Sequence, residues 1–260
     1  MRWQDRGRDG AGRSVQALPT PSANPAGHVV TQTCPMDHRH HKGVMYALRC
    51  TDLNFWEETP GQPDCGVQEV VSTELTKDGN GLQQELLWRH ETHRANLETY
   101  RETRHVRCHY DASNQAFVWT WTSHREALRD HRLTMSNWSM PNTKGDRINY
   151  HGLGIRLPRS WAFPIETMRG CTVAGQAMDW REAHGAAAEE VTLWGTFDGH
   201  WDPPAGSVTF RQEHGYAHFV LMDGFAYLSA GPSNAAELDV RAGETFDEQF
   251  TIEVADRISL

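Results

Sequence analysis

Beyond residue 27 the chain consists mostly of short segments in which apolar and polar residues alternate. The segments 117–121 and 250–254 show this most clearly, with an aromatic or aliphatic side chain at every second position. A period of two residues is typical of β-strands with one buried face. Further strands are predicted at 28–33, 44–50, 67–75, 82–89, 96–109, 131–137, 150–157, 190–197, 206–211, 217–222, 225–230 and 236–240.

Turns that contain glycine separate these segments. Asp-Gly pairs mark turns at 78–81 and 198–199, and the pair at 223–224 predicts a tight hairpin. Helical periodicity is weak and is confined to 124–130 and 180–187. Many short strands, with no alternating helices, predict an all-β fold: a large antiparallel β-sandwich with little helix.

The start of the chain differs from the rest in composition. It is rich in glycine, arginine, serine and alanine, and it contains Pro19, Pro21 and Pro25. Such a composition favours irregular structure. We therefore expect an irregular N-terminal lead-in at 1–27 and a single β-sandwich domain at 28–260.

Composition and charge limit the classes of partner. The formal net charge of −9 at pH 7 disfavours binding to a nucleic-acid backbone. No apolar run approaches the roughly 18 residues of a transmembrane helix, and no apolar segment follows the N-terminal charges as in a signal peptide. Five cysteines without a CxxC pair argue against a disulfide framework. The sequence predicts a soluble, cytoplasmic protein with a small-molecule partner and no membrane or nucleic-acid contact, and it leaves the oligomeric state open.

The segment 37–43, Asp-His-Arg-His-His-Lys-Gly, holds the most concentrated candidate chemistry. Imidazole transfers protons near neutral pH and also binds metal ions. Asp37, His38, His40 and His41 are therefore the candidate catalytic residues. On an extended backbone, His38 and His40 would share one face and His41 would lie on the other. The alternative is a polar turn exposed to solvent.

A divalent metal is a second option for this cluster. The His-x-His spacing occurs in metal-binding β-barrels, where a carboxylate ligand follows four or five residues later. Val44 and Met45 occupy those positions here. A metal would therefore need a distant ligand such as Glu98, His151 or His200.

Other segments carry candidate binding groups. The segment 150–156 contains His151 and ends in Arg156, a cation that can grip a carboxylate or a sugar hydroxyl. The loop 198–204 offers an imidazole and an aromatic platform, His200 and Trp201.

A charged, strand-like run contains Glu98, Arg101, Glu102 and Arg104. For these residues an outer sheet face with cross-strand pairs is at least as well favoured as catalysis.

These motifs resemble those of a bacterial family named methane-oxygenase PmoA-like. Its Asp-His-Pro-His-His-Arg-Gly pattern corresponds to 37–43, which is followed here by an aromatic strand and by the segment 54–56, Asn-Phe-Trp. The segments 151–156 and 242–245 and the residue Trp180 resemble its later motifs. The similarity extends from about residue 17 to residue 256, which is nearly the whole chain.

The resemblance implies a large β-sandwich, with a mutarotase-like supersandwich as one form of it. Such domains are often found beside sugar-oxidising dehydrogenases and sugar isomerases, and the family has no settled activity. This chain departs from the family pattern at Arg39, where proline is usual, and at Leu48, where many members have histidine. The loop 198–204 departs from it as well.

Residues and resemblance together predict an enzyme that acts on a carbohydrate or a similar polyhydroxylated metabolite by histidine acid/base chemistry, of the lyase or hydrolase type. His40 or His41 would transfer the proton, and Asp37 would orient an imidazole. Cations, for which a divalent metal could substitute, would stabilise negative charge, and tryptophan would stack on the ring. The candidate substrate-binding residues are Lys42, Trp56, Glu98, His151, Arg156, His200 and Trp201.

Two alternatives belong to other classes. A non-catalytic sugar-binding β-sandwich would use the same histidines and tryptophans only to bind. A tailoring enzyme or accessory protein of a specialised pathway would explain the departures from the family pattern.

Overall fold

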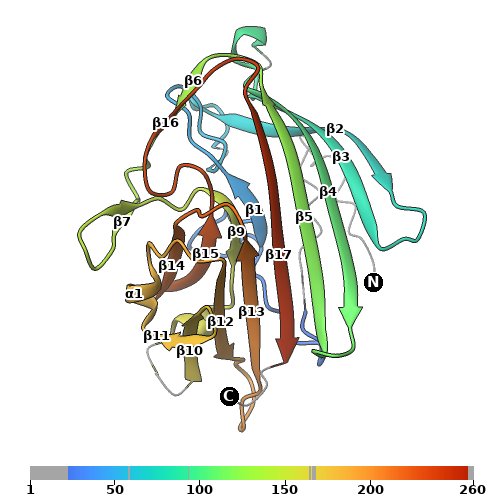
Figure 1. Cartoon of the computed structure of the whole chain (residues 1–260), viewed down its shortest axis with the longest axis vertical. Coiled ribbons are helices and arrows are strands. Elements are labelled where there is room, and N and C mark those ends of the chain that lie inside the picture. The colour runs from blue at the N-terminus through green and yellow to red at the C-terminus, as the bar shows by residue number, and fades with distance from the viewer. Residues whose placement is uncertain (1–22, 58, 93, 164, 166–167, 257–260) are drawn as a thin grey trace.

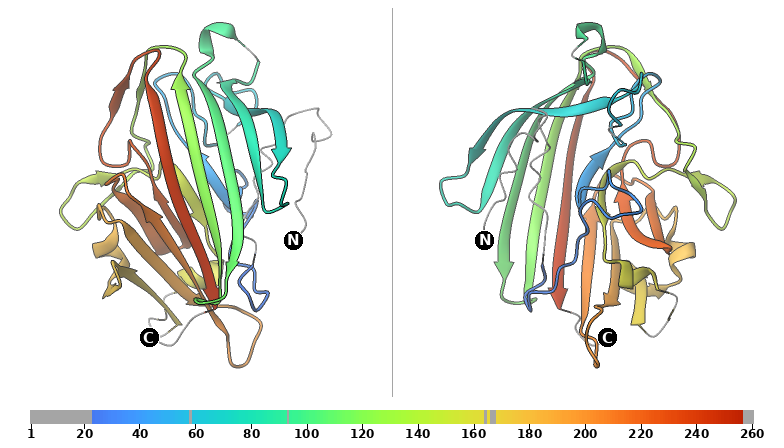
Figure 2. Two further views of the ribbon diagram at one scale, coloured as in Figure 1. Left: turned by 45° about the vertical axis from the view of Figure 1, so that its right-hand side comes forward. Right: turned by 180° about the vertical axis from the view of Figure 1, so that it is seen from behind.

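Two antiparallel β-sheets of unequal size face each other in the computed structural model (Figures 1 and 2). The structure describes residues 23–57, 59–92, 94–163, 165 and 168–256. The predicted all-β fold with little helix is confirmed. Most of the predicted lead-in at 1–27 lies outside the described residues.

The larger sheet has nine strands, and every neighbouring pair in it is antiparallel. In spatial order they are β11 (Gln176–Met178), β10 (Arg169–Val173), β12 (Glu190–Thr196), β13 (Ala205–Gln212), β17 (Thr245–Asp256), β5 (Ala116–Ala127), β4 (Tyr100–Asp111), β3 (Gly81–His90) and β2 (Gly66–Leu75).

The smaller sheet has four strands in the order β1 (Val44–Ala47), β9 (Gly152–Arg156), β15 (Phe225–Ala230) and β14 (His218–Asp223). Two short ribbons pair β16 (Leu238–Val240) with β6 (His131–Leu133) and β7 (Met140–Pro141) with β8 (Arg147–Ile148). The short helices are α1 (Trp180–Ala183) and the 3₁₀ turns η1 (Ala95–Leu97) and η2 (Arg159–Ala162).

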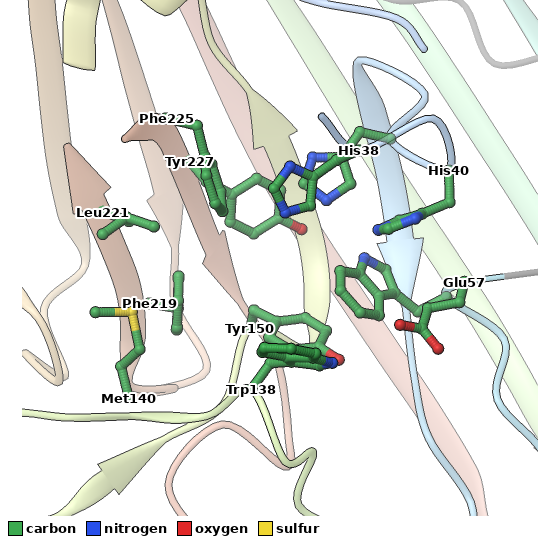
Figure 3. Close-up of a pocket in the computed structure, with 12 residues that line it drawn as sticks. His38, His40, Glu57, Trp138, Met140, Tyr150, Phe219, Leu221, Phe225 and Tyr227 are labelled. Atoms are coloured by element: carbon green, nitrogen blue, oxygen red, sulfur yellow. The ribbon is translucent and has the colours of Figure 1, made fainter. Parts of the chain in front are cut away.

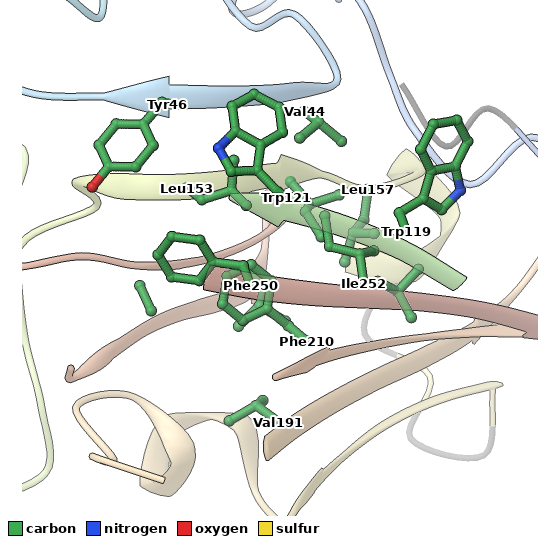
Figure 4. Close-up of a cluster of buried hydrophobic side chains, with 14 of the residues drawn as sticks. Val44, Tyr46, Trp119, Trp121, Leu153, Leu157, Val191, Phe210, Phe250 and Ile252 are labelled. Carbon is green, nitrogen blue, oxygen red and sulfur yellow. The ribbon is translucent and has the colours of Figure 1, made fainter. Parts of the chain in front are cut away.

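The main core lies between the two sheets. Trp121, Phe250 and Ile252 project from β5 and β17 of the large sheet, and Tyr46 and Leu153 project toward them from the small one (Figure 4). The alternation in 117–121 and 250–254 therefore predicted the buried face correctly. Burial of this aromatic and aliphatic surface is the main favourable contribution to folding.

The small sheet is buried on both of its faces. Every residue of β1 and β9 is buried, and apart from Arg156 at the end of β9 neither strand carries a charged side chain. On the face turned away from the large sheet, a second apolar cluster contains Met45, Phe219 and Tyr227. This second cluster underlies the candidate site.

Ionic groups are buried inside the main core as well. Arg125 pairs with Glu248, and the hydroxyl of Tyr46 donates to both oxygens of Glu248 at 2.7 and 2.8 Å. Beside them, Arg104 pairs with Glu102 at 2.7 Å. The prediction that Glu102 and Arg104 lie on an outer face was wrong, because β4 turns both side chains into the core.

Several predicted elements differ from those observed. The segment 28–33 forms only an isolated bridge, Thr33 to Lys42, and 96–109 begins with η1 before β4 starts. The weak helix at 124–130 is the end of β5, whereas 180–187 does contain α1. The hairpin at 223–224 is confirmed, with Gly224 at a φ of +71° between β14 and β15.

Candidate functional site

The histidine-rich segment forms a compact turn rather than an extended strand. The Thr33–Lys42 bridge closes the turn, and the amide of His41 donates to the carbonyl of His38 at 2.9 Å. Gly43 then leaves the turn with a φ of +83°, a conformation that disfavours other residues. The turn brings all three imidazoles to one side, so the prediction that His41 lies on the opposite face was wrong.

Asp37 is the electrostatic anchor of the turn. Its carboxylate lies 2.9 Å from Arg156 Nη2, 3.2 Å from Arg159 Nη2 and 3.1 Å from His38 Nδ1. Burial alone would raise the pKa of Asp37, but hydrogen bonds from Arg156 and His38 and the Arg156 charge lower it well below its usual range. Asp37 therefore stays ionised beside the His38 ring.

Arg156 contributes to the site through its contacts with Phe225 and Asp37. Its side chain is fully buried and stacks on Phe225, with Cζ 4.1 Å from the ring centroid. It does not belong to the lining of the pocket described below, so the direct substrate grip predicted for it is not what the geometry provides. Its charge holds Asp37 instead.

The three imidazoles open onto a pocket of about 290 Å³ on the outer side of the small sheet (Figure 3). The ring centroids of His38 and His41, and of His40 and His41, are 4.8 Å apart, and Trp56 lies 4.5 Å from His40. The remaining wall consists of Glu57, Trp138, Met140, Tyr150, Phe219, Leu221, Phe225 and Tyr227.

Two buried N–H groups of residues that line the pocket have no protein partner among the described residues. Arg156 Nη1 lies 3.4 Å from His41 Nδ1, and a guanidinium can only donate, so Nδ1 is the acceptor. A neutral His41 must then carry its hydrogen on Nε2, which is buried and has no partner in the described structure. The same holds for Trp56 Nε1. The centroids of the His41 and Trp56 rings lie 5.8 Å apart.

Burial keeps two of the imidazoles neutral. Desolvation, reinforced by the charges of His38, Arg156 and Lys42, lowers the pKa of His40 to about 4. Desolvation also lowers the pKa of His41, to about 2. At neutral pH these two rings therefore act as uncharged donors and acceptors.

These pKa values predict how stability depends on pH. A histidine whose folded pKa lies below its unfolded value of 6.5 stabilises the fold fully above that pH, and this contribution is lost as the pH falls toward the folded pKa. Besides His40 and His41, burial lowers the pKa of His151 to about 3 and that of His218 to about 4. The free energy of unfolding in urea should therefore change little between pH 7.5 and about pH 6.5 and fall from there to pH 5.

The His40→Gln variant should show a shallower pH dependence than the wild type, because one of the shifted groups is absent. A free energy of unfolding that stays constant or rises as the pH falls from 7.5 to 5 would contradict the burial of these rings.

Several predicted binding residues lie elsewhere. Trp201 is fully exposed, and the ring of His200 packs against His28, at 5.5 Å between centroids. His151 is fully buried behind Tyr150 and contacts Asn149 and Ser233. None of these three predicted residues, nor Glu98 or Lys42, belongs to the pocket lining.

The aromatic wall of the pocket escaped sequence reasoning. Phe219 and Leu221 on β14 and Phe225 and Tyr227 on β15 come from strands that read simply as buried. The available signal was that these strands are apolar at successive positions, which indicates that both faces of the sheet are covered.

Glu57 was missed as well. Its amide and that of Trp56 both donate to the side-chain oxygen of Asn54, which fixes the turn that carries the carboxylate to the pocket. An Asn two residues before an aromatic residue is a recognisable turn signal of this kind.

A metal ion was the second option for the histidine cluster. Within the part of the chain that the structure describes, no group of three or more His, Cys, Asp or Glu side chains is arranged to hold a metal ion. Across the same residues, no helix is long and apolar enough to cross a membrane. All five cysteines lie within the described residues, and none of them forms a disulfide there.

Fold and site thus define an antiparallel β protein with an imidazole-lined aromatic pocket on its smaller sheet. The chain belongs to a family of unknown function, DUF6807, whose model matches residues 3–259. The resemblance to the methane-oxygenase PmoA-like family is not confirmed by this match. No curated protein matches the sequence.

Among solved structures, the chain is similar to the GH36 α-galactosidase AgaB from Geobacillus stearothermophilus, with 13% sequence identity and a TM-score of 0.33. The alignment covers 92% of this chain and 30% of that one. The chain therefore spans less than a third of the length of that enzyme.

Proposed function

We propose that the protein is an enzyme that transfers a proton on a small-molecule substrate bound in this pocket. The observation that carries the proposal is the convergence of three imidazoles and an indole N–H on one end of the pocket, beside an ionised carboxylate. Such an arrangement combines a general base with donors for the oxygen on which charge develops.

His38 is the proposed general base. The Asp37 carboxylate next to Nδ1 favours the tautomer with its hydrogen on Nδ1, which leaves the lone pair of Nε2 for the substrate. Asp37 also stabilises the imidazolium that forms. His40 is a poorer base at neutral pH because burial lowers its pKa to about 4.

His41 and Trp56 are the proposed oxygen-binding donors. Their free N–H groups would stabilise the negative charge that develops when His38 removes a proton. A lyase or hydrolase reaction fits these roles. A carbohydrate substrate remains a prediction from sequence, supported here only by the aromatic surface on which a ring can stack.

Solvent labelling tests the proposal with a mixture of candidate substrates. The protein is incubated with a small-metabolite extract in D₂O or in H₂¹⁸O, and the products are analysed by mass spectrometry. We expect deuterium for a lyase, or ¹⁸O for a hydrolase, to appear in at least one metabolite with the wild type and not with His38→Gln.

Heat-inactivated protein controls for spontaneous exchange. Equal labelling by the wild type and His38→Gln would remove His38 from the chemistry. If no metabolite is labelled by the wild type, the non-catalytic binding protein becomes the better description.

A further inference from the structure

We infer that the pocket takes a flat, mostly apolar molecule with a single neutral oxygen group, of the class of aromatic alcohols and phenols. This substrate class rests on the proposed function, because it assumes that the imidazole-lined pocket is the functional site. It replaces the polyhydroxylated ligand expected from sequence.

The polar groups of the pocket are confined to one part of it. Hydrogen-bonding nitrogens come from the histidine turn and Trp56, with Glu57 beside them, whereas the opposite wall is formed by Met140, Phe219 and Leu221 (Figure 3). The hydroxyl of Tyr150 already donates to Ser136 Oγ at 2.7 Å, so Tyr150 offers a ligand the apolar surface of its ring. A ligand with hydroxyls around its whole edge would leave several of them against carbon.

That mismatch weighs against a sugar. A hydroxyl that loses its water and gains no partner weakens binding by roughly 5- to 150-fold, so two or three such groups would cancel the gain from stacking. An aromatic ring has no such groups to desolvate. The Trp56 and Tyr150 rings, 4.0 Å apart between centroids, already form an aromatic surface on which a flat ligand can pack.

The charge of the site favours a neutral polar end. Glu57 lines the pocket, so a ligand carboxylate would meet a negative group there, whereas the Asp37 charge is already balanced by Arg156 and Arg159. The charge of Arg156 is already engaged by Asp37. A hydroxyl oxygen can instead accept from His41 Nε2 and Trp56 Nε1 and offer its own hydrogen to His38. The volume of about 290 Å³ suits one or two rings.

Isothermal titration of the wild type with three probes tests the class. The probes are 2-naphthol, 2-naphthoate and methyl β-D-glucopyranoside, which differ in polar end and in the number of hydroxyls. We expect 2-naphthol to bind at least about tenfold more tightly than either of the other two. Tighter or equal binding of the glucoside or of the naphthoate would overturn the inference, as would no binding of 2-naphthol up to its solubility limit.

Two tryptophan variants locate the binding. Trp138 lines the pocket although 68% of it is exposed, so Trp138→Ala should fold normally. It should weaken 2-naphthol binding by about tenfold, because an aromatic contact is lost. Trp201→Ala is the matched control, because Trp201 is fully exposed and lies outside the lining. Equal effects of the two variants would place the ligand elsewhere.

The titrations test the substrate class separately from the enzymatic activity proposed above. His38→Gln should still bind 2-naphthol, because the His41 and Trp56 donors and the aromatic wall remain and the glutamine oxygen can accept the ligand hydrogen in place of the imidazole. Binding without any labelled product would sustain the substrate class and end the enzymatic proposal. Solvent labelling of a sugar, with no binding of 2-naphthol, would do the reverse.

Discussion

Replacing His38 with glutamine is expected to lower kcat by about 10²–10⁴-fold. Glutamine keeps a polar side chain of similar reach at a partly exposed position, but it cannot accept a proton at neutral pH. The binding of substrate should change little, since His41, Trp56 and the aromatic wall still hold it. The measurement is steady-state kinetics on the substrate that solvent labelling identifies.

The matched control is His200→Gln, the same substitution in a loop outside the pocket lining. It should leave kcat and KM unchanged. A His38→Gln variant with wild-type kcat, or a His200→Gln variant as impaired as His38→Gln, would contradict the assignment of the base. A loss that appears only in KM would show that His38 binds but does not transfer the proton.

The fold could be predicted largely from sequence because its long strands alternate clearly. In β5 and β17 every second residue faces a core that has only one side, so the pattern is regular. The small sheet is harder, since β1 and β9 are buried on both faces and carry no alternation. Segment 28–33 shows the limit: Val30 is buried although the segment forms no strand beyond the Thr33–Lys42 bridge, and the local pattern does not reveal this.

For the site, residue types were predictable and their arrangement was not. The density of imidazoles in 37–43 marks a place where burial would be costly, and it did lead to Asp37, His38, His40 and His41. Which face each ring takes depends on the turn closed by the Thr33–Lys42 bridge. The far wall comes from β14 and β15, about 180 residues later in the chain, and only the packed sheet brings it there.

The wrong prediction for the charged residues of β4 has a similar physical reason. Alternation along a strand predicts which residues share a face. When both faces carry charged residues, it does not predict which face is buried. In β4 the inner face holds Glu102 and Arg104, fully buried, while Arg101 faces outward. A buried ion pair is tolerated only when each charge has a partner and further hydrogen bonds. Here Ser123 and Trp88 supply those bonds to Glu102.

The strongest stability effect is therefore expected from Arg125→Met. This substitution removes the charged partner of Glu248 and leaves its carboxylate in the core with the neutral hydroxyls of Tyr46 and Tyr216 as hydrogen-bond partners. An uncompensated buried charge costs about 3–5 kcal/mol, which corresponds to a fall in Tm of about 10 °C for a chain of this size. Denaturant unfolding and calorimetry at pH 7.5 measure both quantities.

Two further variants show whether Arg125→Met destabilises the protein by leaving the charge of Glu248 unpaired or by removing packing contacts of the arginine. Arg101→Met makes the same change at an exposed arginine that pairs with Glu126 at 3.6 Å, and it should shift the free energy of unfolding by less than about 1 kcal/mol. The double variant Arg125→Met with Glu248→Gln should recover at least half of the loss, because no unpaired charge remains and Gln can still accept from Tyr46. If the double variant is as unstable as Arg125→Met alone, the arginine stabilises the core through its packing on the Tyr46 ring, 4.0 Å away, and not through its charge.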